Sequence, residues 1–237
     1  MGARVLFVEG GGRARAELRD AMAGEGYRIA AAAAGAEALD QLRANGAPDV
    51  VLVDLVLGDM DGFSCIREIR RDHDVPIMVV TDRDDTHDVV AALEAGADDF
   101  VSEPFEVKEV TARVRALRRR AERAMPRDAD RERLVLDAHP VAPLELAQDR
   151  GTVRRGTKDL QLTLTEYRLL CELAGNAGRV VSRPALLESV WGGEYFGDER
   201  IVDVHVRRLR KKIERDPSEP RIVVTVRGLG YRLDPPD

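Results

Sequence analysis

Five short apolar runs, separated by helical patterns, constrain the fold of the first half of the chain more than any other feature. The runs are RVLFV, YRIAA, DVVLVDL, VPIMVV and DDFVS, which begin at residues 4, 27, 49, 75 and 98. Runs this uniformly apolar are typical of strands that are covered on both faces. Their alternation with helices predicts an α/β fold with a doubly wound, five-stranded parallel sheet.

A charged stretch separates this half from a second pattern. The stretch ALRRRAERAMPRDADRERL has no apolar period and contains Pro126. We therefore expect a first domain over 1–120, a linker over 121–133 and a second domain over 134–237. In the second domain, the strand-like pieces LELAQ, GTVRR and LQLT precede three helical patterns and a hairpin, RIVVTVRGLGYRL. This order predicts an α+β fold.

Two helices of the second domain carry clear start signals. Thr163 and Glu166 have the spacing of a capping box, which opens the first helix. Ser182 with Pro184 opens the second helix.

Composition and charge favour a globular protein with two different tasks. The chain is 44% hydrophobic and 34% charged, which supplies enough apolar surface for buried cores. The first 120 residues contain 23 acidic and 16 basic residues, whereas the rest contain 20 and 21. No apolar stretch approaches the ~20 residues of a membrane span, and the N-terminus lacks a signal-peptide layout. We therefore expect a cytoplasmic protein without a membrane partner, in which Cys65 and Cys171 form no disulfide.

Three consecutive glycines, Gly10 to Gly12, follow the first apolar run and raise the question of a phosphate-binding loop. A dinucleotide fingerprint needs a third glycine where Arg15 stands and an acidic residue after the second strand, which ends in AAAAAG. A Walker loop needs a final Gly-Lys-Ser/Thr, which is also missing. Neither nucleotide motif is present.

Polar residues instead follow the other predicted strands. Asp54 closes the third strand, Thr81 closes the fourth, and Glu103 follows the fifth. The carboxyl ends of parallel strands meet at one edge of a sheet, where ligands bind. We expect these side chains to share one crevice with Glu9, which follows the first strand.

The first domain resembles the receiver domain of bacterial two-component response regulators over residues 3–119. The stretches PDVVLVDLVLGDMDG, VPIMVVT, ALEAGADDF and EPFEVKEV carry the likeness. The resemblance implies a phosphoacceptor at Asp54, Mg²⁺ held by an acidic pair after the first strand, and phosphoryl contacts from Thr81 and a lysine. Phe100 stands where the family has its switching aromatic residue.

Two positions depart from that pattern. Glu9 keeps one acid of the pair, but Gly10 stands where the direct metal ligand belongs, and Glu103 replaces the lysine. Losing a carboxylate weakens a Mg²⁺ site. Two unit charges ~4 Å apart at an effective dielectric of ~20 interact by roughly 4 kcal/mol, so reversing a charge at residue 103 opposes phosphorylation strongly. We expect an atypical receiver with no cofactor, doubtful Mg²⁺ binding and no other metal site.

Three uses of the crevice stay open at this stage. Asp54 and Thr81 are strand-end residues of an inactive scaffold, or they support slow residual phosphorylation. In the third alternative the crevice binds something else, such as a small molecule or a cation held by Glu9, Asp54 and Glu103.

The helical pattern ERIVDVHVRRLRKKIER is amphipathic with a basic face. At 100° per residue, Val202, Val206, Leu209 and Ile213 share one side. The opposite side collects mostly cations: Arg200, Val204, Arg207, Arg208, Lys211 and Arg215. A basic helix followed by a basic hairpin indicates nucleic-acid contact.

The second domain resembles the winged helix-turn-helix DNA-binding domain of the OmpR/PhoB family, through LTLTEYRLL, VVSRPALLESVWG, RIVDVHVRRLRKKIE and VVTVRGLGYRL. The resemblance places the basic helix in the major groove, with Arg200 and Arg208 near base edges and Val204 near a thymine methyl. It implies phosphate contacts from His205, Arg207, Arg210 and Lys211. Arg227 matches the residue that reaches into the minor groove.

These observations predict a sequence-specific, DNA-binding transcriptional regulator of the response-regulator type and not an enzyme. Its receiver would act without standard phosphorylation, as a constitutive or concentration-driven dimeriser. The alternatives are a conventional regulator with weakened phosphorylation, or a small-molecule sensor at the crevice. The expected partners are double-stranded DNA with direct-repeat half-sites, a second copy of the chain and RNA polymerase, with a histidine kinase left open. The face expected to pair two receivers contains Asp98, Asp99, Glu109, Arg113 and Arg115.

Overall fold

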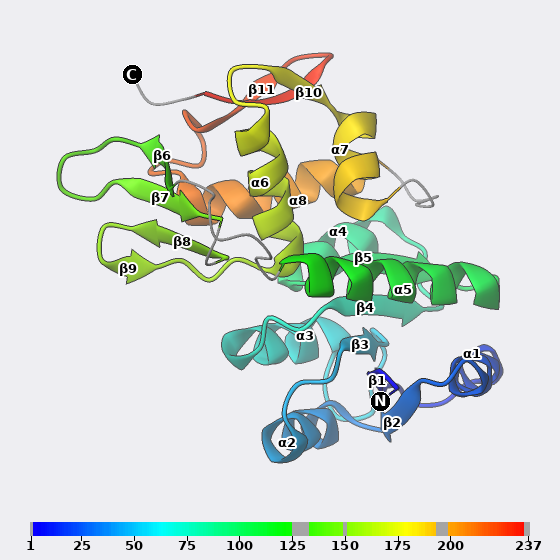
Figure 1. Cartoon of the computed structure of the whole chain (residues 1–237). Helices are drawn as coiled ribbons and strands as arrows, with labels where there is room; N and C mark the ends of the chain where they lie inside the picture. Colours follow the sequence, from blue (N-terminus) through cyan, green and yellow to red (C-terminus); the bar gives the residue numbers. More distant parts are fainter. Residues whose placement is uncertain (1, 125–132, 149–150, 193–198, 235–237) are drawn as a thin grey trace. The chain divides into compact units, whose positions relative to one another are not determined.

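The computed structural model describes residues 2–124, 133–148, 151–192 and 199–234, which fall into two compact units (Figure 1). The first unit covers Met1–Arg119 and the second covers Arg120–Asp237. Of the expected linker, residues 125–132 lie outside the described residues. Residues 121–124 continue the last helix of the first unit, and Arg133 begins a strand of the second.

The first unit is the expected doubly wound parallel sheet. Its strands have the order β2-β1-β3-β4-β5, and every neighbouring pair is parallel. The strands are β1 (Arg4–Val8), β2 (Arg28–Ala32), β3 (Val50–Val53), β4 (Ile77–Thr81) and β5 (Asp99–Ser102). They alternate with α1 (Arg13–Gly24), α2 (Gly35–Asn45), α3 (Gly62–Asp72), α4 (Thr86–Ala95) and α5 (Val107–Ala124).

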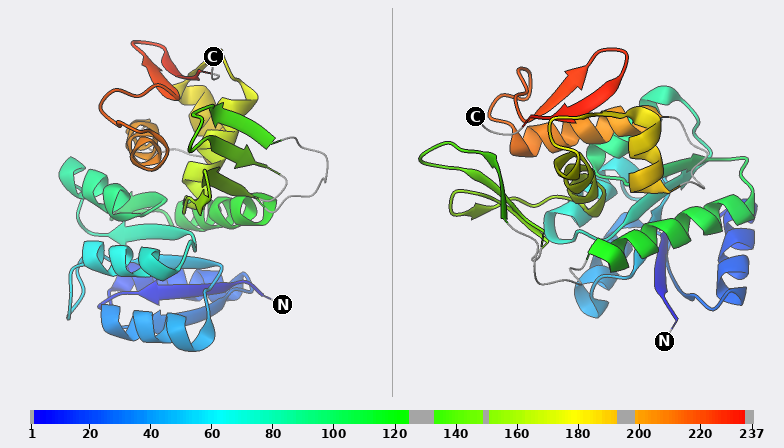
Figure 2. Two further views of the ribbon diagram at one scale, coloured as in Figure 1. Left: turned by 90° about the vertical axis from the view of Figure 1, so that its left-hand side faces the viewer. Right: turned by 45° about the horizontal axis from the view of Figure 1, so that its top comes forward.

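Helices cover both faces of this sheet, as Figure 2 shows. On one face, Leu18 and Met22 of α1 pack with Val114 and Leu117 of α5 over the strands. On the other, α3 packs against both α2 and α4. Burial on both faces explains why β1, β3 and β4 read as continuous apolar runs in the sequence, whereas the edge strand β2 is mostly exposed. It also leaves the carboxyl ends of the strands as the place where polar side chains gather.

The second unit has two antiparallel sheets around three helices. The first sheet has the order β6-β7-β8-β9, with β6 (Arg133–Asp137), β7 (Leu144–Ala147), β8 (Thr152–Arg155) and β9 (Lys158–Asp159). The helices are α6 (Leu164–Gly175), α7 (Arg183–Trp191) and α8 (Arg200–Ile213). The second sheet has the order β10-β12-β11, with β10 (Val180–Ser182), β11 (Val223–Val226) and β12 (Gly230–Leu233). The hairpin of β11 and β12, red in Figure 1, forms the wing of the expected winged helix.

The helix start signals are confirmed, but one expected strand is wrong. Thr163 and Glu166 form the capping box of α6, and Ser182 caps α7 with Pro184 in its first turn. The piece LQLT at 160–163 is not a strand, because the hydroxyl of Thr163 accepts from Glu166 N and so begins α6. Cys65 is buried and Cys171 is partly buried, and both are free thiols.

Candidate functional site

The carboxyl edge of the first sheet brings together the polar side chains that follow its strands. Glu9 follows β1, and Asp54 follows β3; both are buried, and both line a small cavity with Arg15. Thr81 ends β4 and is fully buried, and its carbonyl accepts a 2.7 Å hydrogen bond from the backbone N of Glu103. The crevice therefore assembles as expected, but it contains an additional residue.

Arg15 of α1 occupies the crevice and was not predicted to lie there. Its Nη1 donates to Asp54 Oδ2 at 2.7 Å and to the carbonyl oxygen of Gly11 at 3.0 Å. Its Nε lies 3.2 Å from Glu103 Oε1. The side chain of Arg15 is only 10% exposed. One guanidinium is thus held between two carboxylates, where the receiver resemblance implies a metal ion and a lysine.

The glycine run shapes the backbone that holds this guanidinium. Gly11 and Gly12 have φ angles of 101° and 145°, a region that favours glycine because side chains with a Cβ clash there. The turn starts α1 at Arg13 and directs the Gly11 carbonyl to Arg15. Gly10 differs, since a Cβ added to it would meet only Val56 O, at 3.9 Å. The surroundings of residue 10 would therefore accept a Cβ, so glycine is not required there for steric reasons.

A second arginine of α1 accompanies Glu9. Arg19 Nη1 lies 3.0 Å from Glu9 Oε1, and the Glu9 side chain is 4% exposed. Burial raises the pKa of Glu9 above its ordinary value; Arg19 and Arg15 oppose the rise, and the nearby carboxylates of Asp54 and Glu103 add to it. The edge of the sheet therefore holds three carboxylates with two guanidinium groups among them.

Asp54 also lines a small cavity toward the core. The cavity lined by Glu9, Arg15 and Asp54 has a volume of about 10 Å³, close to the minimum for one water molecule. Its other lining residues are mostly apolar side chains of the core, and neither Thr81 nor Glu103 is among them. Among the described residues, no group of three or more His, Cys, Asp or Glu side chains is arranged to hold a metal ion.

The residues expected to switch or to pair receivers have other surroundings. Phe100 is half-buried on β5. Asp98 and Asp99 each pair with an arginine of the same unit. Asp98 Oδ2 accepts from Arg70 Nη2 at 2.7 Å, and Asp99 Oδ1 accepts from Arg113 Nη1 at 3.0 Å.

Arg113 also pairs with Glu109, at 2.7 Å, and the role of these residues in pairing two receivers stays a prediction. The charge of Arg113 is used inside the unit. Of the expected pairing residues, Glu109 and Arg115 keep exposed side chains, at 34% and 57%.

In the second unit, α8 has the expected apolar side and an exposed basic side. Val202, Val206, Leu209 and Ile213 are fully buried. The exposed cations of the helix are Arg200, Arg207 and Lys211. Arg227 is exposed in the turn of the wing.

Three of the residues expected to touch DNA have little exposed surface. Val204 is 9% exposed. His205 is fully buried, with its ring 5.2 Å from that of Trp191. Arg208 is also buried, and its Nη2 lies 3.0 Å from Glu166 Oε1 on α6. Two of these side chains thus have partners within the second unit, on α7 and α6, and the expected DNA contacts of all three stay predictions.

Arg210, on α8, is half-buried and donates hydrogen bonds to the wing. Its Nε donates to the Val223 carbonyl at 2.8 Å and its Nη2 to Thr225 Oγ1 at 2.9 Å. Burial lowers the pKa of Arg210. A phosphate contact would compete with these bonds, so we reassign Arg210 to holding β11 on α8.

A further contact between α8 and the wing was not expected from the sequence. Asp203 Oδ1 accepts from the Tyr231 hydroxyl at 2.6 Å and from Arg183 Nε at 2.7 Å. Burial and the Asp203 carboxylate raise the pKa of Tyr231 to about 12. These bonds join the first turns of α7 and α8 to β12.

Two family descriptions match the chain: "Response regulator receiver domain" over residues 5–115 and "Transcriptional regulatory protein, C terminal" over residues 156–233. The chain is 43% identical over 232 residues to the transcriptional regulatory protein AfsQ1 of Streptomyces coelicolor, covering 98% of each. It is 41% identical over 233 residues to the DNA-binding response regulator MtrA of Mycobacterium tuberculosis, covering 98% of this chain and 97% of MtrA.

Solved structures agree over the full length. A RitR mutant matches with a TM-score of 0.75 and 27% identity, over 98% of this chain and 99% of that one. The Thermotoga maritima OmpR/PhoB homologue DrrB matches with a TM-score of 0.50 and 29% identity, over 99% and 100% of the two chains. Among the described residues, no helix is long and apolar enough to cross a membrane.

Proposed function

The chain belongs to the OmpR/PhoB family of DNA-binding transcriptional response regulators, and from that membership we propose a regulator whose receiver works without Mg²⁺-dependent phosphorylation of Asp54. The observation that carries the proposal is the buried 2.7 Å ion pair between Arg15 and Asp54. The guanidinium of Arg15, which would neutralise the charge of a phosphoryl group, is already paired with the carboxylate that would accept that group.

This pairing acts on the chemistry of phosphoryl transfer in two ways. A carboxylate oxygen that accepts a charge-assisted hydrogen bond is a weaker nucleophile, because the bond stabilises its negative charge. Glu103, which lies 3.2 Å from the same guanidinium, would then face the phosphoryl oxygens as a like charge. Both effects oppose the formation of an acyl phosphate on Asp54.

The same groups do not suit Mg²⁺. This ion needs near-octahedral oxygen ligands at short distance. Gly10 offers no carboxylate, while Glu9 and Asp54 are each paired with an arginine. We therefore propose that Mg²⁺ has no resident site here and that the receiver requires no cofactor.

A conventional regulator with weakened phosphorylation is the second candidate, and one atom favours it. Asp54 Oδ1 is buried and accepts no hydrogen bond from the described residues. This oxygen would be the attacking atom if Arg15 moved aside. A small-molecule sensor at the crevice finds less support, because Arg15 and Arg19 already pair with Asp54, Glu103 and Glu9, the side chains that such a ligand would contact.

The DNA-binding half of the proposal rests on the exposed cations of α8 and the wing. Arg200, Arg207 and Lys211 lie on the exposed side of α8, and Arg227 lies in the turn between β11 and β12. We propose that α8 enters the major groove and that Arg227 reaches the minor groove. Two copies of the chain would occupy direct-repeat half-sites, with RNA polymerase as the downstream partner.

Intact-mass measurement after treatment with acetyl phosphate and Mg²⁺ tests the receiver half. The parent should gain no phosphoryl group, and neither should Arg13→Ala, which removes an exposed arginine of the same helix. The triple variant Gly10→Asp, Arg15→Ala, Glu103→Lys should gain one. Adding Asp54→Asn to the triple variant should abolish that gain. Near-stoichiometric phosphorylation of the parent within minutes would refute the proposal and favour the second candidate.

A further inference from the structure

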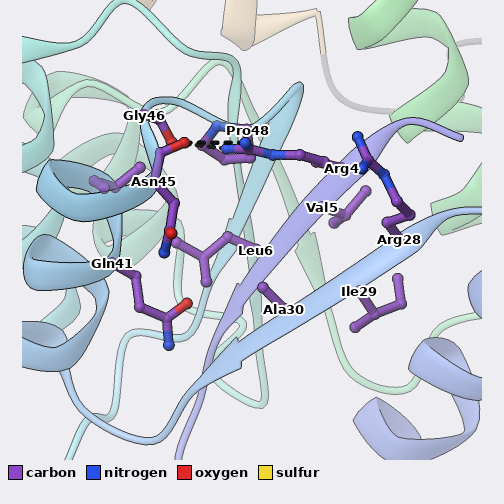
Figure 3. Close-up of a pocket in the computed structure, with 11 residues that line it drawn as sticks. Arg4, Val5, Leu6, Arg28, Ile29, Ala30, Gln41, Asn45, Gly46 and Pro48 are labelled. Carbon is purple, nitrogen blue, oxygen red and sulfur yellow. Dashed lines mark hydrogen bonds between the residues drawn. The ribbon is translucent and has the colours of Figure 1, made fainter. Parts of the chain in front are cut away.

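A pocket of about 270 Å³ lies at the opposite end of the sheet from Asp54. It opens between the amino-terminal halves of β1 and β2 and the last turns of α2 (Figure 3). The residues around it include Arg4, Leu6, Arg28, Ala30, Gln41 and Asn45. None of these belongs to the crevice around Asp54 or to the DNA-binding unit.

The register of two strands explains why space remains there. In the parallel pairing of β1 with β2, Arg4 lies beside Arg28 and Leu6 lies beside Ala30. Residues two apart on a strand share a face, so all four lie on the same side of the sheet, the side covered by α2. Ala30 carries only a methyl group next to Leu6, and a larger side chain there would fill the pocket.

The rim of the pocket is positively charged in a domain that is acidic as a whole. The 11 lining residues include two arginines and no acidic residue. Arg4 is held in place because its guanidinium donates to the carbonyls of Asn45 and Gly46, at 3.0 and 2.8 Å. These bonds are the dashed lines in Figure 3.

Arg28 is the second arginine of the pocket, and only one of its guanidinium nitrogens donates a hydrogen bond to a described residue. Its Nε donates to the Gly2 carbonyl at 3.0 Å, and its terminal nitrogens donate to no residue in the part of the chain that the structure describes. A planar guanidinium with two such nitrogens matches a carboxylate, which accepts two parallel hydrogen bonds. The lining also contains the apolar side chains of Leu6, Ala30 and Leu42 beside the polar side chains of Gln41 and Asn45.

We propose that this pocket binds a small organic carboxylic acid. The carboxylate pairs with Arg28, and the apolar body of the acid lies on Leu6, Ala30 and Leu42. The volume is close to the lower end of about 300–1,000 Å³ for small-molecule sites, which suits a compact acid and not a nucleotide. This inference goes beyond the proposed function, because it holds whether or not Asp54 accepts phosphate.

Methyl NMR of the full chain, without phosphodonor or Mg²⁺, tests this proposal. The probes are hexanoate, octanoate, benzoate and phenylacetate; their neutral amides and inorganic phosphate are the controls. At least one acid should shift the methyl resonances of Ile29, Ala30 and Leu42, and its amide and phosphate should not. The acid should also raise the Tm, because it binds the folded state.

Three variants locate the binding. Arg28→Gln should weaken the acid at least tenfold, and Ala30→Leu should abolish binding by filling the space. Arg43→Gln should bind like the parent, since Arg43 is an exposed residue of α2 that pairs with Asp40 and does not line the pocket. The proposal is overturned if no acid shifts these methyls, if an amide binds as tightly as its acid, or if Arg28→Gln binds like the parent.

Discussion

A guanidinium between two carboxylates differs from a metal ion in being covalently attached to the chain. Arg15 reaches Asp54 and Glu103 from the first turn of α1, so its effective concentration is fixed by the backbone and chelators do not remove it. The net charge of this cluster is negative. Glu9, Asp54 and Glu103 outnumber Arg15 and Arg19, which leaves Glu9 as a buried acid whose pKa is raised by that burial.

Glu9 should make the receiver less stable as the pH rises. An acid whose pKa is higher in the folded state than its ordinary value of 4.5 keeps its proton better when folded. The folded chain then binds more protons than the unfolded chain, so the free energy of unfolding falls as the pH rises from 4.5 through the folded pKa. Glu9→Gln removes this dependence. Urea unfolding across acidic and neutral pH should show a flatter profile and higher stability at neutral pH than the parent.

The control for this prediction is Glu17→Gln, which changes an exposed glutamate on α1 that pairs with Arg13. Its stability profile should follow that of the parent. Equal pH profiles for Glu9→Gln and the parent would mean that Arg19 fully compensates the burial of Glu9.

At the scale of the element, the cations of α8 fall into two groups: exposed side chains, and side chains that pair with Glu166 of α6. Arg207 and Lys211 are exposed, whereas Arg208 is buried against Glu166. Glu166 is itself buried, and besides Arg208 it pairs with Lys212 and caps α6. The cations Arg208 and Lys212 hold the pKa of Glu166 below its ordinary value, although burial acts in the opposite direction. α8 is therefore fastened to α6 by charges that do not face outward.

Two substitutions on α8 should distinguish these two groups. Lys211→Ala should leave the free energy of unfolding nearly unchanged and reduce the slope of log K against log salt by about 0.9, the value for one phosphate contact. Arg208→Ala should keep that slope but lower the free energy of unfolding by about 3–5 kcal/mol, because Glu166 loses a buried partner. Salt titrations of DNA binding and urea unfolding measure both quantities. An unchanged slope in Lys211→Ala would exclude it from the interface.

The sequence predicted the elements well and the partners of individual side chains poorly. The parallel sheet follows from five apolar runs, since a strand covered on both faces can contain little else. The amphipathic period of α8 correctly identified Val202 and Leu209 as buried. It could not distinguish Arg207 from Arg208, because adjacent positions differ by 100° and only α6 decides which of them is covered.

The position of Arg15 in the crevice was not predicted, for a related reason. An arginine on a helix is most often solvated. No local sequence pattern indicates that the carboxyl ends of β3 and β5 lie opposite Arg15. The only signal was indirect: Gly10 and Glu103 together remove the charges that the crevice of a receiver would use. A replacement cation could have been sought on that basis.

At the scale of the whole molecule, the chain forms two compact units, and we expect the receiver to act on transcription by changing where and how tightly the second unit binds. Pairing two chains raises the effective concentration of the second DNA-binding unit at a neighbouring half-site. Because Asp98, Asp99 and Arg113 are used within one unit, we expect the pairing of receivers to be weak and to depend on DNA.

The full chain should bind a direct repeat more tightly than a single half-site in the absence of any phosphodonor. Receivers that pair without phosphorylation supply the extra free energy, and Asp54→Asn should leave the ratio of the two affinities unchanged. Electrophoretic mobility shifts with one and two half-sites measure this ratio. Equal affinities would remove the pairing of receivers from the proposal and leave DNA binding by α8 and the wing intact.

The Arg15 contacts also bear on how readily such a protein could regain a phosphorylation switch in evolution. Gly10→Asp alone would add a further negative charge to a cluster that already has an acidic excess, and Glu103→Lys alone would set a second cation beside Arg15. Each intermediate would carry an unfavourable interaction of roughly 4 kcal/mol at close range, although the combined change is nearly balanced. We therefore expect sign epistasis between residues 10 and 103, in which each single variant is less stable than both the parent and the double variant.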